Sequence, residues 1–350
     1  MSRDTLSDVL RSVRLRSAVF YYVSCDGNWV AEAPASCDIA DAVMPDSEHV
    51  IAYHVVTSGE CWAAVNAEAP RRLRRGDIIL LPQGDAHVVS SAPGLRAEPN
   101  VGAYFAMGRD QRPFRVHYAG GLQPEAEVDQ GGAPLRDGRA PDTTLVCGFI
   151  GCDARPFNPL LATLPRLMHL AAGAGNDCSS QFATFAAAES ASRRPGGEAL
   201  LERLSEMMFV DAIRRHVDTL PEESTGWLAG LRDRIVGRAL TLLHERPAAA
   251  WTIDELGSQV GLSRSALHQR FVDLVGQPPM QYLTQWRMKL ASRLLRDTQQ
   301  GVAAIALDVG YDSEAAFTRA FRRAVGMPPA AWRRQQARSA TAAPVAAQQR

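Results

Sequence analysis

The stretch GDIILLPQGDAH, residues 76–87, ends in a histidine whose imidazole can bind a metal or transfer a proton. Four consecutive aliphatic residues predict a buried strand at 78–81, and Pro82 and Gly84 turn the chain before His87. This order of strand, corner and histidine is typical of the rim of a metal-dependent barrel. Whether His87 does chemistry depends on the ligands that neighbouring strands supply.

Other imidazole and thiol groups occur in runs that also have the pattern of strands. His49 and His54 stand five residues apart in HVIAYHVVTS, so in one continuous strand they face opposite sides of the sheet. His54 and His87 are expected to border the same interior, which Cys25 in SCDGNW and Cys147 in TTLVCGFIGC would bracket. Two thiolates and two imidazoles suit tetrahedral zinc, copper or a redox-responsive site.

The elements that must position these groups change in character along the chain. Up to about Val101, short β-type runs are broken by glycine, proline and aspartate, which favours a sandwich or a small barrel. The patterns after that region predict a flexible loop at 108–143, helical segments at 158–170 and 197–217 with a loop of small polar residues at 171–197 between them, and helices throughout 227–334.

Composition limits the classes of protein to consider. Of the 350 residues, 46% are hydrophobic and 22% are charged, as in an ordinary globular protein of about two domains. No apolar run approaches the roughly 20 residues that cross a bilayer, and the N-terminus has no signal-peptide core. We therefore expect a cytoplasmic protein with no membrane partner. The net charge is zero, but Leu231–Arg334 has 15 Lys plus Arg against 9 Asp plus Glu, which suggests a polyanionic partner for this end.

The C-terminal part contains an internal duplication. Residues 252–271 and 302–321 each contain a short helix, a glycine, a serine cap and a second helix. Gly261 and Gly310 permit the tight turn of a helix-turn-helix unit. Between the units, a helix of about 19 residues from Pro279 would be about 28 Å long, close to the ~34 Å between successive major-groove segments. The alternative is a helical bundle whose arginines only face solvent.

The second helix of each unit presents polar or basic side chains opposite its core anchors. At about 100° per residue, Leu267 and Phe271 face the core in the first unit, as Phe317 and Phe321 do in the second. Side chains on the outward face can donate to base edges and phosphates. The outward or flanking residues are Ser265, His268 and Gln269 in the first unit and Ala315, Thr318, Arg319 and Arg322 in the second.

From GQPPMQYLTQWRMKLASRLLRD to the second repeat and GMPPAAWRR, the sequence closely resembles the AraC-type transcription regulators, over about residues 228–334. The resemblance implies two helix-turn-helix units joined by one long helix, with promoter DNA as the partner. It places base or backbone contacts on Ser265, His268, Gln269, Glu314, Ala315, Thr318 and Arg319, and Arg264, Arg270 and Arg322 are further basic candidates. Because Glu314 and Ala315 are poor phosphate ligands, the second unit is expected to position the protein more than to read bases.

The stretch at 76–87 in turn resembles the second motif of cupin barrels, G-x5-P-x-G-x2-H. The first cupin motif usually supplies two histidines and a glutamate, and the stretch HVIAYHVVTSGE departs from it, so the three-ligand catalytic cage is missing. Loss of this cage is typical of cupin-like sensor domains in AraC-type proteins. Resemblance to a subgroup with a cysteine near GxW, two such histidines and a VCG cysteine selects Cys25, His54, His87 and Cys147 as a metal or redox cluster. A structural role is the alternative for each residue, because cysteine is a common buried hydrophobe.

The expected fold is therefore α+β with two domains, a cupin-like β-barrel with dimerisation helices and an all-α double helix-turn-helix domain. The expected function is a DNA-binding transcription regulator and not an enzyme, in which the barrel senses a small effector, a metal such as Zn²⁺, or an oxidant. A homodimer and RNA polymerase are the expected protein partners. The alternative is a cupin dioxygenase or isomerase fused to a DNA-binding module. The expected boundaries are 1–157 for the barrel, 158–220 for the dimerisation segment, 221–227 for a linker, 228–334 for the DNA-binding domain and 335–350 for a disordered tail. The expected contact stripe of the dimerisation segment consists of Leu200, Leu204, Met207 and Met208, and the alternative is that these residues pack inside the chain.

Overall fold

The computed structural model describes residues 4–65, 68–106, 114–119, 127–128, 140–173, 178–192 and 195–345. Its chain forms two compact units. The helical unit comprises Met1–Arg14, Asp153–Thr163 and Val217–Arg350, and the sheet unit comprises Leu15–Cys152 and Leu164–His216. This division differs from the expected boundaries, because two segments from the N-terminal half of the chain pack on the C-terminal helices. Within the described residues, no helix is long and apolar enough to cross a membrane.

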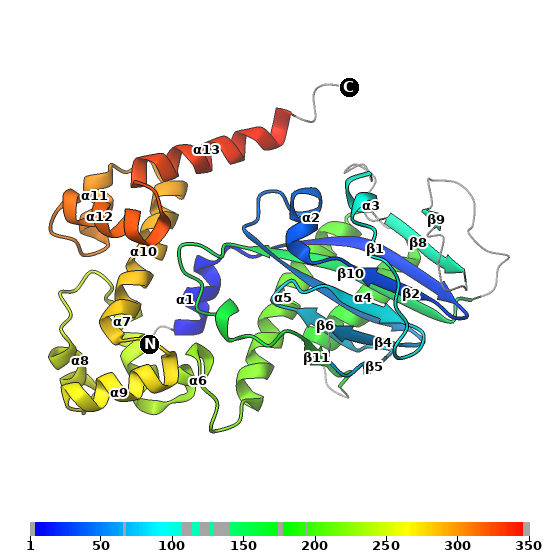
Figure 1. Cartoon of the computed structure of the whole chain (residues 1–350), viewed down its shortest axis with the longest axis horizontal. Coiled ribbons are helices and arrows are strands. Elements are labelled where there is room, and N and C mark those ends of the chain that lie inside the picture. Colours follow the sequence, from blue (N-terminus) through cyan, green and yellow to red (C-terminus); the bar gives the residue numbers. More distant parts are fainter. Residues whose placement is uncertain are drawn as a thin grey trace. The chain divides into compact units, whose positions relative to one another are not determined.

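Two sheets form the core of the sheet unit (Figure 1). The seven-stranded sheet has the order β11-β6-β3-β10-β1-β8-β9, and the four-stranded sheet has the order β2-β7-β4-β5. Strand β8 runs parallel to β1, whereas the central pairs β1–β10 and β10–β3 are antiparallel. The strands are β1 (Arg16–Asp26), β2 (Val30–Ala33), β3 (His49–Ser58), β4 (Glu60–Val65), β5 (Arg71–Arg74), β6 (Ile78–Leu81), β7 (His87–Ser90), β8 (Phe114–Ala119), β9 (Glu127–Val128), β10 (Thr143–Cys152) and β11 (Met168–Leu170).

Alternation along the strands sends every second side chain into the space between the two sheets. Val50, Ala52 and Val56 of β3 belong to this core, together with Cys61 of β4 and Leu73 of β5. The described strands form two facing sheets rather than the expected closed barrel, because no strand of one sheet pairs with a strand of the other.

Helices α4 and α5 differ from what was expected for the dimerisation segment. The helices of the sheet unit are α2 (Ser36–Val43), α3 (Val101–Ala106), α4 (Cys178–Ser192) and α5 (Gly197–Thr219), of which α5 continues from His216 into the helical unit. Helix α4 falls in the expected loop 171–197, whose alanines favour a helix, and its Phe182 packs on Tyr53 of β3 with ring centroids 5.9 Å apart. Met208 is fully buried, while Leu200 and Met207 are each 53% exposed, so the expected contact stripe is divided between two faces of α5.

Two further expectations at this level were wrong. The segment 158–170 is not a helix, because Pro159 and Pro165 interrupt helical hydrogen bonding; it holds a short 3-10 turn, η2 (Leu161–Thr163), and strand β11. The expected loop 108–143 contains β8, where Phe114 and Val116 enter the core, and the short β9. Residues 108–113, 120–126 and 129–139 lie outside the described residues.

The helical unit contains two helix-turn-helix pairs, α8–α9 and α11–α12, with helix α10 between them (Figure 1). In both pairs a serine caps the second helix, since Ser263 Oγ and Ser313 Oγ each accept a hydrogen bond from the backbone N–H three residues later at 3.3 Å. The helices are α1 (Thr5–Ser12), α6 (Trp227–Arg232), α7 (Arg234–Glu245), α8 (Ile253–Val260), α9 (Arg264–Val275), α10 (Pro279–Asp297), α11 (Val302–Asp308), α12 (Glu314–Val325) and α13 (Pro329–Val345). Helix α13 occupies most of the tail that was expected to be disordered, and residues 346–350 lie outside the described part.

Helix α10 contributes to the cores of both pairs. Near its start, Tyr282 packs on Phe271 of α9 with ring centroids 5.9 Å apart. Further along, Met288 and Leu295 join a cluster with Phe317 and Phe321 of α12. The predicted core anchors Leu267, Phe271, Phe317 and Phe321 are all fully buried, which confirms the orientation expected for both second helices.

A buried polar network crosses the first core. Trp227 Nε1 donates to Tyr282 Oη at 2.8 Å, and the Tyr282 hydroxyl then donates to His244 Nε2 at 2.7 Å. His244 therefore carries its proton on Nδ1, which is buried without a hydrogen-bond partner among the described residues. The ring stacks on Trp286 at 4.0 Å between centroids. Burial lowers the pKa of His244 to about 3, so the imidazole is neutral at physiological pH.

Candidate functional site

Three of the four candidate cluster residues meet between the two sheets. Cys147 of β10 and His54 of β3 are direct cross-strand partners on the inner face of the seven-stranded sheet. His87 begins β7 in the four-stranded sheet, where it lies opposite Val65 of β4. The rings of His54 and His87 lie 4.9 Å apart between centroids. The two histidines therefore connect the two sheets through their side chains.

These groups form a hydrogen-bonded chain with one direction. His87 Nδ1 lies 2.9 Å from the carbonyl oxygen of Asp85, which only accepts, so His87 carries its proton on Nδ1 and its Nε2 is an acceptor. His54 Nε2 then donates to His87 Nε2 at 2.7 Å. His54 Nδ1 is left as the acceptor for the Cys147 thiol at 2.9 Å. The chain thus runs from the thiol of Cys147 through both imidazoles to a backbone carbonyl.

Burial holds all three groups of this chain in their neutral forms. Burial lowers the pKa of His54 well below its ordinary value, and the neighbouring His87 lowers it further. The pKa of His87 is lowered mainly by burial, against the opposing effect of its bond to Asp85. Burial and the neighbouring Cys61 raise the pKa of the Cys147 thiol. A neutral thiol is a poor nucleophile, so Cys147 acts here as a hydrogen-bond donor.

The anchoring of this chain involves residues that the sequence did not reveal. The Asp85 carboxylate accepts from Arg166, with Nη2 to Oδ1 at 2.6 Å and Nε to Oδ2 at 3.1 Å. This ion pair fixes the segment whose backbone carbonyl is the last acceptor of the hydrogen-bonded chain. The two residues are 81 positions apart, and no local pattern links them. Asp85 and Arg166 therefore support the chain from outside the candidate set.

Cys25 lies in the same core but outside the hydrogen-bonded chain. On β1 it is opposite Thr143, whereas Cys147 is opposite Tyr21, four residues away along the strand. Burial raises the pKa of Cys25, and the nearby Cys147 and Cys61 raise it further. Cys61, which is not among the candidate residues, is fully buried, and burial raises its pKa to about 12. None of the six cysteines is in a disulfide.

The arrangement of the four residues does not fit one mononuclear metal site. Cys147 lies at the Nδ1 side of His54, and His87 lies at the Nε2 side of the same ring. A single ion bound by His54 can therefore reach only one of these partners. Within the described residues, no group of three or more His, Cys, Asp or Glu side chains is placed to hold a metal ion. The other histidine of β3, His49, bonds at Nε2 to the carbonyl oxygen of Pro82 at 2.7 Å.

The candidate DNA-contact residues lie on the surfaces of α9 and α12. On α9, the side chains of Ser265, His268 and Gln269 are exposed. Gln269 donates to Asp273 at 2.7 Å. On α12, Glu314, Ala315, Arg319 and Arg322 are exposed and Thr318 is partly buried. Both helices therefore present the residues selected from the sequence, opposite their buried anchors.

Two of the basic candidates on α9 already have acidic neighbours. Arg264 lies 3.6 Å from Asp254, and both side chains are exposed. Arg270 Nε donates to Asp233 Oδ1 at 3.2 Å, and the same carboxylate caps α7. A phosphate would therefore compete with a carboxylate for each of these arginines.

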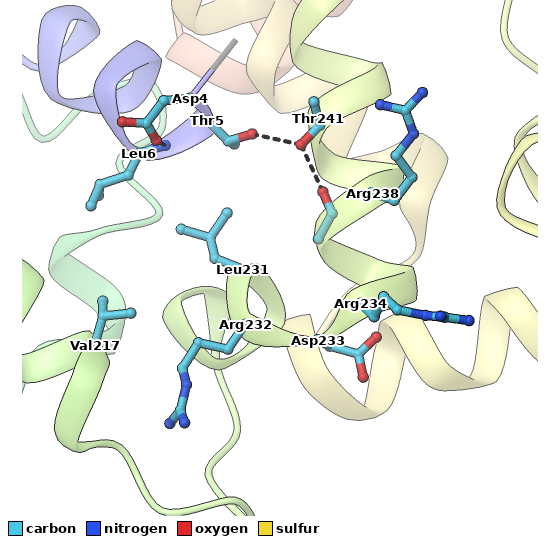
Figure 2. A pocket seen from close by; sticks show the side chains of 11 residues that line it. Asp4, Thr5, Leu6, Val217, Leu231, Arg232, Asp233, Arg234, Arg238 and Thr241 are labelled. Atoms are coloured by element: carbon cyan, nitrogen blue, oxygen red, sulfur yellow. Dashed lines mark hydrogen bonds between the residues drawn. The ribbon is translucent and has the colours of Figure 1, made fainter. Parts of the chain in front are cut away.

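A cavity of about 420 Å³ lies in the helical unit, beside the first turn of α1 and the α6–α7 corner (Figure 2). Leu6, Leu231 and Val217 contribute apolar side chains to its lining. Thr5 Oγ1 and Thr241 Oγ1 lie 3.2 Å apart at one side. Five charged residues also line the cavity, namely Asp4, Arg232, Asp233, Arg234 and Arg238, and none of the residues selected from the sequence lines it.

Comparison with known proteins follows the division into a sheet-rich and a helical part. A family model described as Cupin matches residues 4–218, and a Helix-turn-helix domain model matches residues 256–335. The chain is 33% identical to an AraC-like transcription regulator of Streptomyces lividans and 34% identical to one of Streptomyces antibioticus, in each case over 95% of this chain and 98% of the relative. Among solved structures, the DNA-binding domain of AdpA in complex with a target DNA is 28% identical, covers 29% of this chain and 93% of that chain, and gives a TM-score of 0.29.

Proposed function

Because the chain belongs to the AraC-like transcription regulators and has a cupin-like N-terminal domain, we propose that α9 and α12 read promoter DNA and that the Cys147–His54–His87 chain senses a small effector. The observation that carries the DNA-reading part is the exposure of the candidate residues on two serine-capped helices whose anchors are buried. Such helices offer donors to base edges and phosphates in the major groove.

Replacement of Arg319 by alanine tests the DNA-reading role. We expect Arg319→Ala to weaken binding about tenfold, since one good contact contributes about 1–3 kcal/mol, and to reduce the salt slope by about one if the contact is to phosphate. The probe is a duplex that the wild-type chain selects from a random-sequence pool. Arg334→Ala is the matched control, because Arg334 is an exposed arginine on α13 and lies on neither of the two candidate helices. Unchanged affinity and salt slope for Arg319→Ala would remove Arg319 from the interface.

The sensing role is supported by the directional chain between the two sheets. A molecule or ion that binds to one member of this chain would replace one of its hydrogen bonds. Nitrogen-15 chemical shifts of histidine-labelled protein test the starting state. We expect His87 to carry its proton on Nδ1 and His54 to carry its proton on Nε2 at pH 7. An imidazolium at either position, or the opposite tautomers, would contradict the proposed chain.

A metal or redox signal at this cluster stays part of the proposal. Zinc or another transition metal would require His54 to turn, because its two partners lie on opposite sides of the ring. Elemental analysis of protein purified without a metal-affinity tag tests for about one ion per chain. Thiol titration tests for a reactive pair involving Cys25 and Cys147. If the purified protein contains neither a bound ion nor a reactive thiol pair, a small organic effector remains as the proposed signal.

A homodimer through α5 is the proposed assembly. Leu200 and Met207 lie seven residues apart on one side of the helix, both more than half exposed, with the partly buried Leu204 between them. Analytical ultracentrifugation of Met207→Glu tests this face, and a dimer of unchanged affinity would exclude it. Activation through RNA polymerase belongs to the same proposal and is tested by transcription in vitro from the selected site.

The alternative function is a cupin dioxygenase or isomerase attached to the DNA reader. Such an enzyme needs a set of metal ligands, and within the described residues no group of three or more suitable side chains is placed to provide it. The two Streptomyces relatives reported above are transcription regulators, and the match to this chain covers 98% of each of them. Turnover of an organic substrate by iron-loaded protein would support the enzyme instead.

A further inference from the structure

Helix α10 has a buried polar face that neither helix-turn-helix core uses. Lys289, Ser292 and Arg296 follow one another at spacings of three and four residues, so they lie on the same side of the helix. The Lys289 side chain is 2% exposed and that of Arg296 is 13% exposed. Segments from the N-terminal half of the chain cover this face: Lys289 Nζ donates to the carbonyl oxygen of Arg155 at 3.4 Å, and α1 also contacts α10.

One buried carboxylate serves both cations of this face. Arg296 Nη1 donates to Asp153 Oδ2 at 2.7 Å, and Lys289 Nζ lies 4.0 Å from the same oxygen. The other carboxylate near Arg296 is that of Asp297, which is 48% exposed and accepts from Nε at 3.0 Å. Arg296 Nη2 is buried without a hydrogen-bond partner among the described residues. Because a buried charge is costly unless it is paired, the position of α10 depends on Asp153.

Asp153 is also the first residue after strand β10. Its backbone N–H donates to the carbonyl oxygen of Val13 at 2.8 Å, three residues before β1 begins. The pairing of β1 with β10 begins close to these two residues, with Arg16 opposite Gly151. The two strands that meet beside Asp153 include β10, which carries Cys147. The carboxylate that pairs with α10 thus belongs to the residue that directly follows the first segment of the sheet unit, Leu15–Cys152.

We propose that Asp153 is a positioning residue for DNA reading, which sets the separation of α9 and α12 by neutralising Lys289 and Arg296 and so fixing α10. This inference rests on the proposed DNA-reading roles of the two helices. A duplex that engages both helices gains affinity over a duplex that engages one only when their separation is fixed, because the second contact then forms at high effective concentration. Loss of the Asp153 carboxylate is expected to reduce this gain specifically.

The test compares two duplexes, using the full chain. One is the site selected from a random-sequence pool, and the other is the same site with the segment footprinted by α12 replaced. We expect Asp153→Asn to reduce the ratio of the two affinities about tenfold, while the affinity for the one-helix duplex changes less than about twofold. Asp297→Asn is the matched control, since it removes the exposed carboxylate from the same arginine, and it is expected to leave the ratio unchanged.

The outcomes separate positioning from general destabilisation. An equal loss for both duplexes, no loss for either, or a wild-type chain that does not prefer the two-helix duplex would overturn the inference. If Asp153→Asn does not fold, the same substitution is made in a Lys289→Met protein, which lacks one of the two buried cations. An unchanged ratio of the two affinities in that protein would also overturn the inference. Failure of the DNA-reading proposal would give a different result, in which the Arg319→Ala variant binds both duplexes as tightly as the wild type does.

Discussion

Acidification is expected to destabilise the helical unit through His244. This imidazole accepts from Tyr282, stacks on Trp286 and is buried, which lowers its pKa to about 3. In the unfolded chain an ordinary histidine has a pKa of about 6.5. As pH falls below about 6.5 the unfolded state binds a proton that the folded state excludes, so this contribution to stability is full above pH 6.5 and is lost towards pH 3.

The size of the effect follows from the width of this window. Each pH unit between the two pKa values changes the free energy of unfolding by about 1.4 kcal/mol for one group. Between pH 7 and pH 5 only the part below 6.5 counts, so His244 alone is expected to contribute a loss of about 2 kcal/mol. A neutral glutamine at this position still accepts from Tyr282 and cannot take up a proton in this range.

Urea unfolding of the full chain at pH 7 and pH 5, followed by tryptophan fluorescence, measures the effect. The pH-dependent loss in His244→Gln is expected to be smaller than in the wild type by about 2 kcal/mol, whatever its stability at pH 7. The histidines of the sheet unit contribute equally to both proteins and cancel in this difference. His268→Gln, which changes an exposed histidine on α9, is the matched control. An equal pH-dependent loss in wild type and His244→Gln would refute the buried neutral imidazole.

Two further predictions concern the turns and the thiols. Gly310→Ala should lower the free energy of unfolding by about 3 kcal/mol in thermal or urea unfolding, because φ is +84° and the new Cβ would lie 2.6 Å from the carbonyl oxygen of Ala248. At the matching Gly261, where φ is +76° and the space is open, alanine should lower it by only about 1 kcal/mol. Equal losses for the two substitutions would contradict this reasoning. With a thiol reagent, the exposed Cys37 should react first and Cys147 only on unfolding, since burial raises the pKa of the latter. Cys37→Ser should remove the fast phase, and labelling of Cys147 in the folded Cys37→Ser protein would contradict its burial.

The sequence predicted the helical unit better than the sheet unit because its signals repeat and are local. The anchors Phe271 and Phe321 occupy equivalent places in two copies of one pattern, each preceded by a serine cap and a glycine turn. Spacing along one helix determines which residues face outward. The exposure of Ser265 and Arg319 therefore followed from the sequence without knowledge of any distant contact.

The features that the sequence could not show depend on pairing between distant strands and segments. Cys25 and Cys147 both face the core, but the register of β1 against β10 offsets them by four residues, and the sequence contains no record of that register. Asp153 and Arg296 are 143 positions apart, so no local spacing links them. Helix α4 was missed for a different reason, since its small residues resemble a loop until Phe182 is seen to pack on the sheet.

The composition of the helical unit has a consequence for how the two parts can be recombined. The sheet unit is an insertion within the helical unit, which resumes at Asp153–Thr163 and again at Val217. A fragment that starts at residue 217 would keep both helix-turn-helix pairs but lose the acid that neutralises Lys289 and Arg296. A chimera joined at the 221–227 linker would inherit the same defect unless the donor supplied an equivalent acid. If the sheet unit is the sensor proposed above, we expect an exchanged sensor to need its own closing segment, with an aspartate after its last long strand.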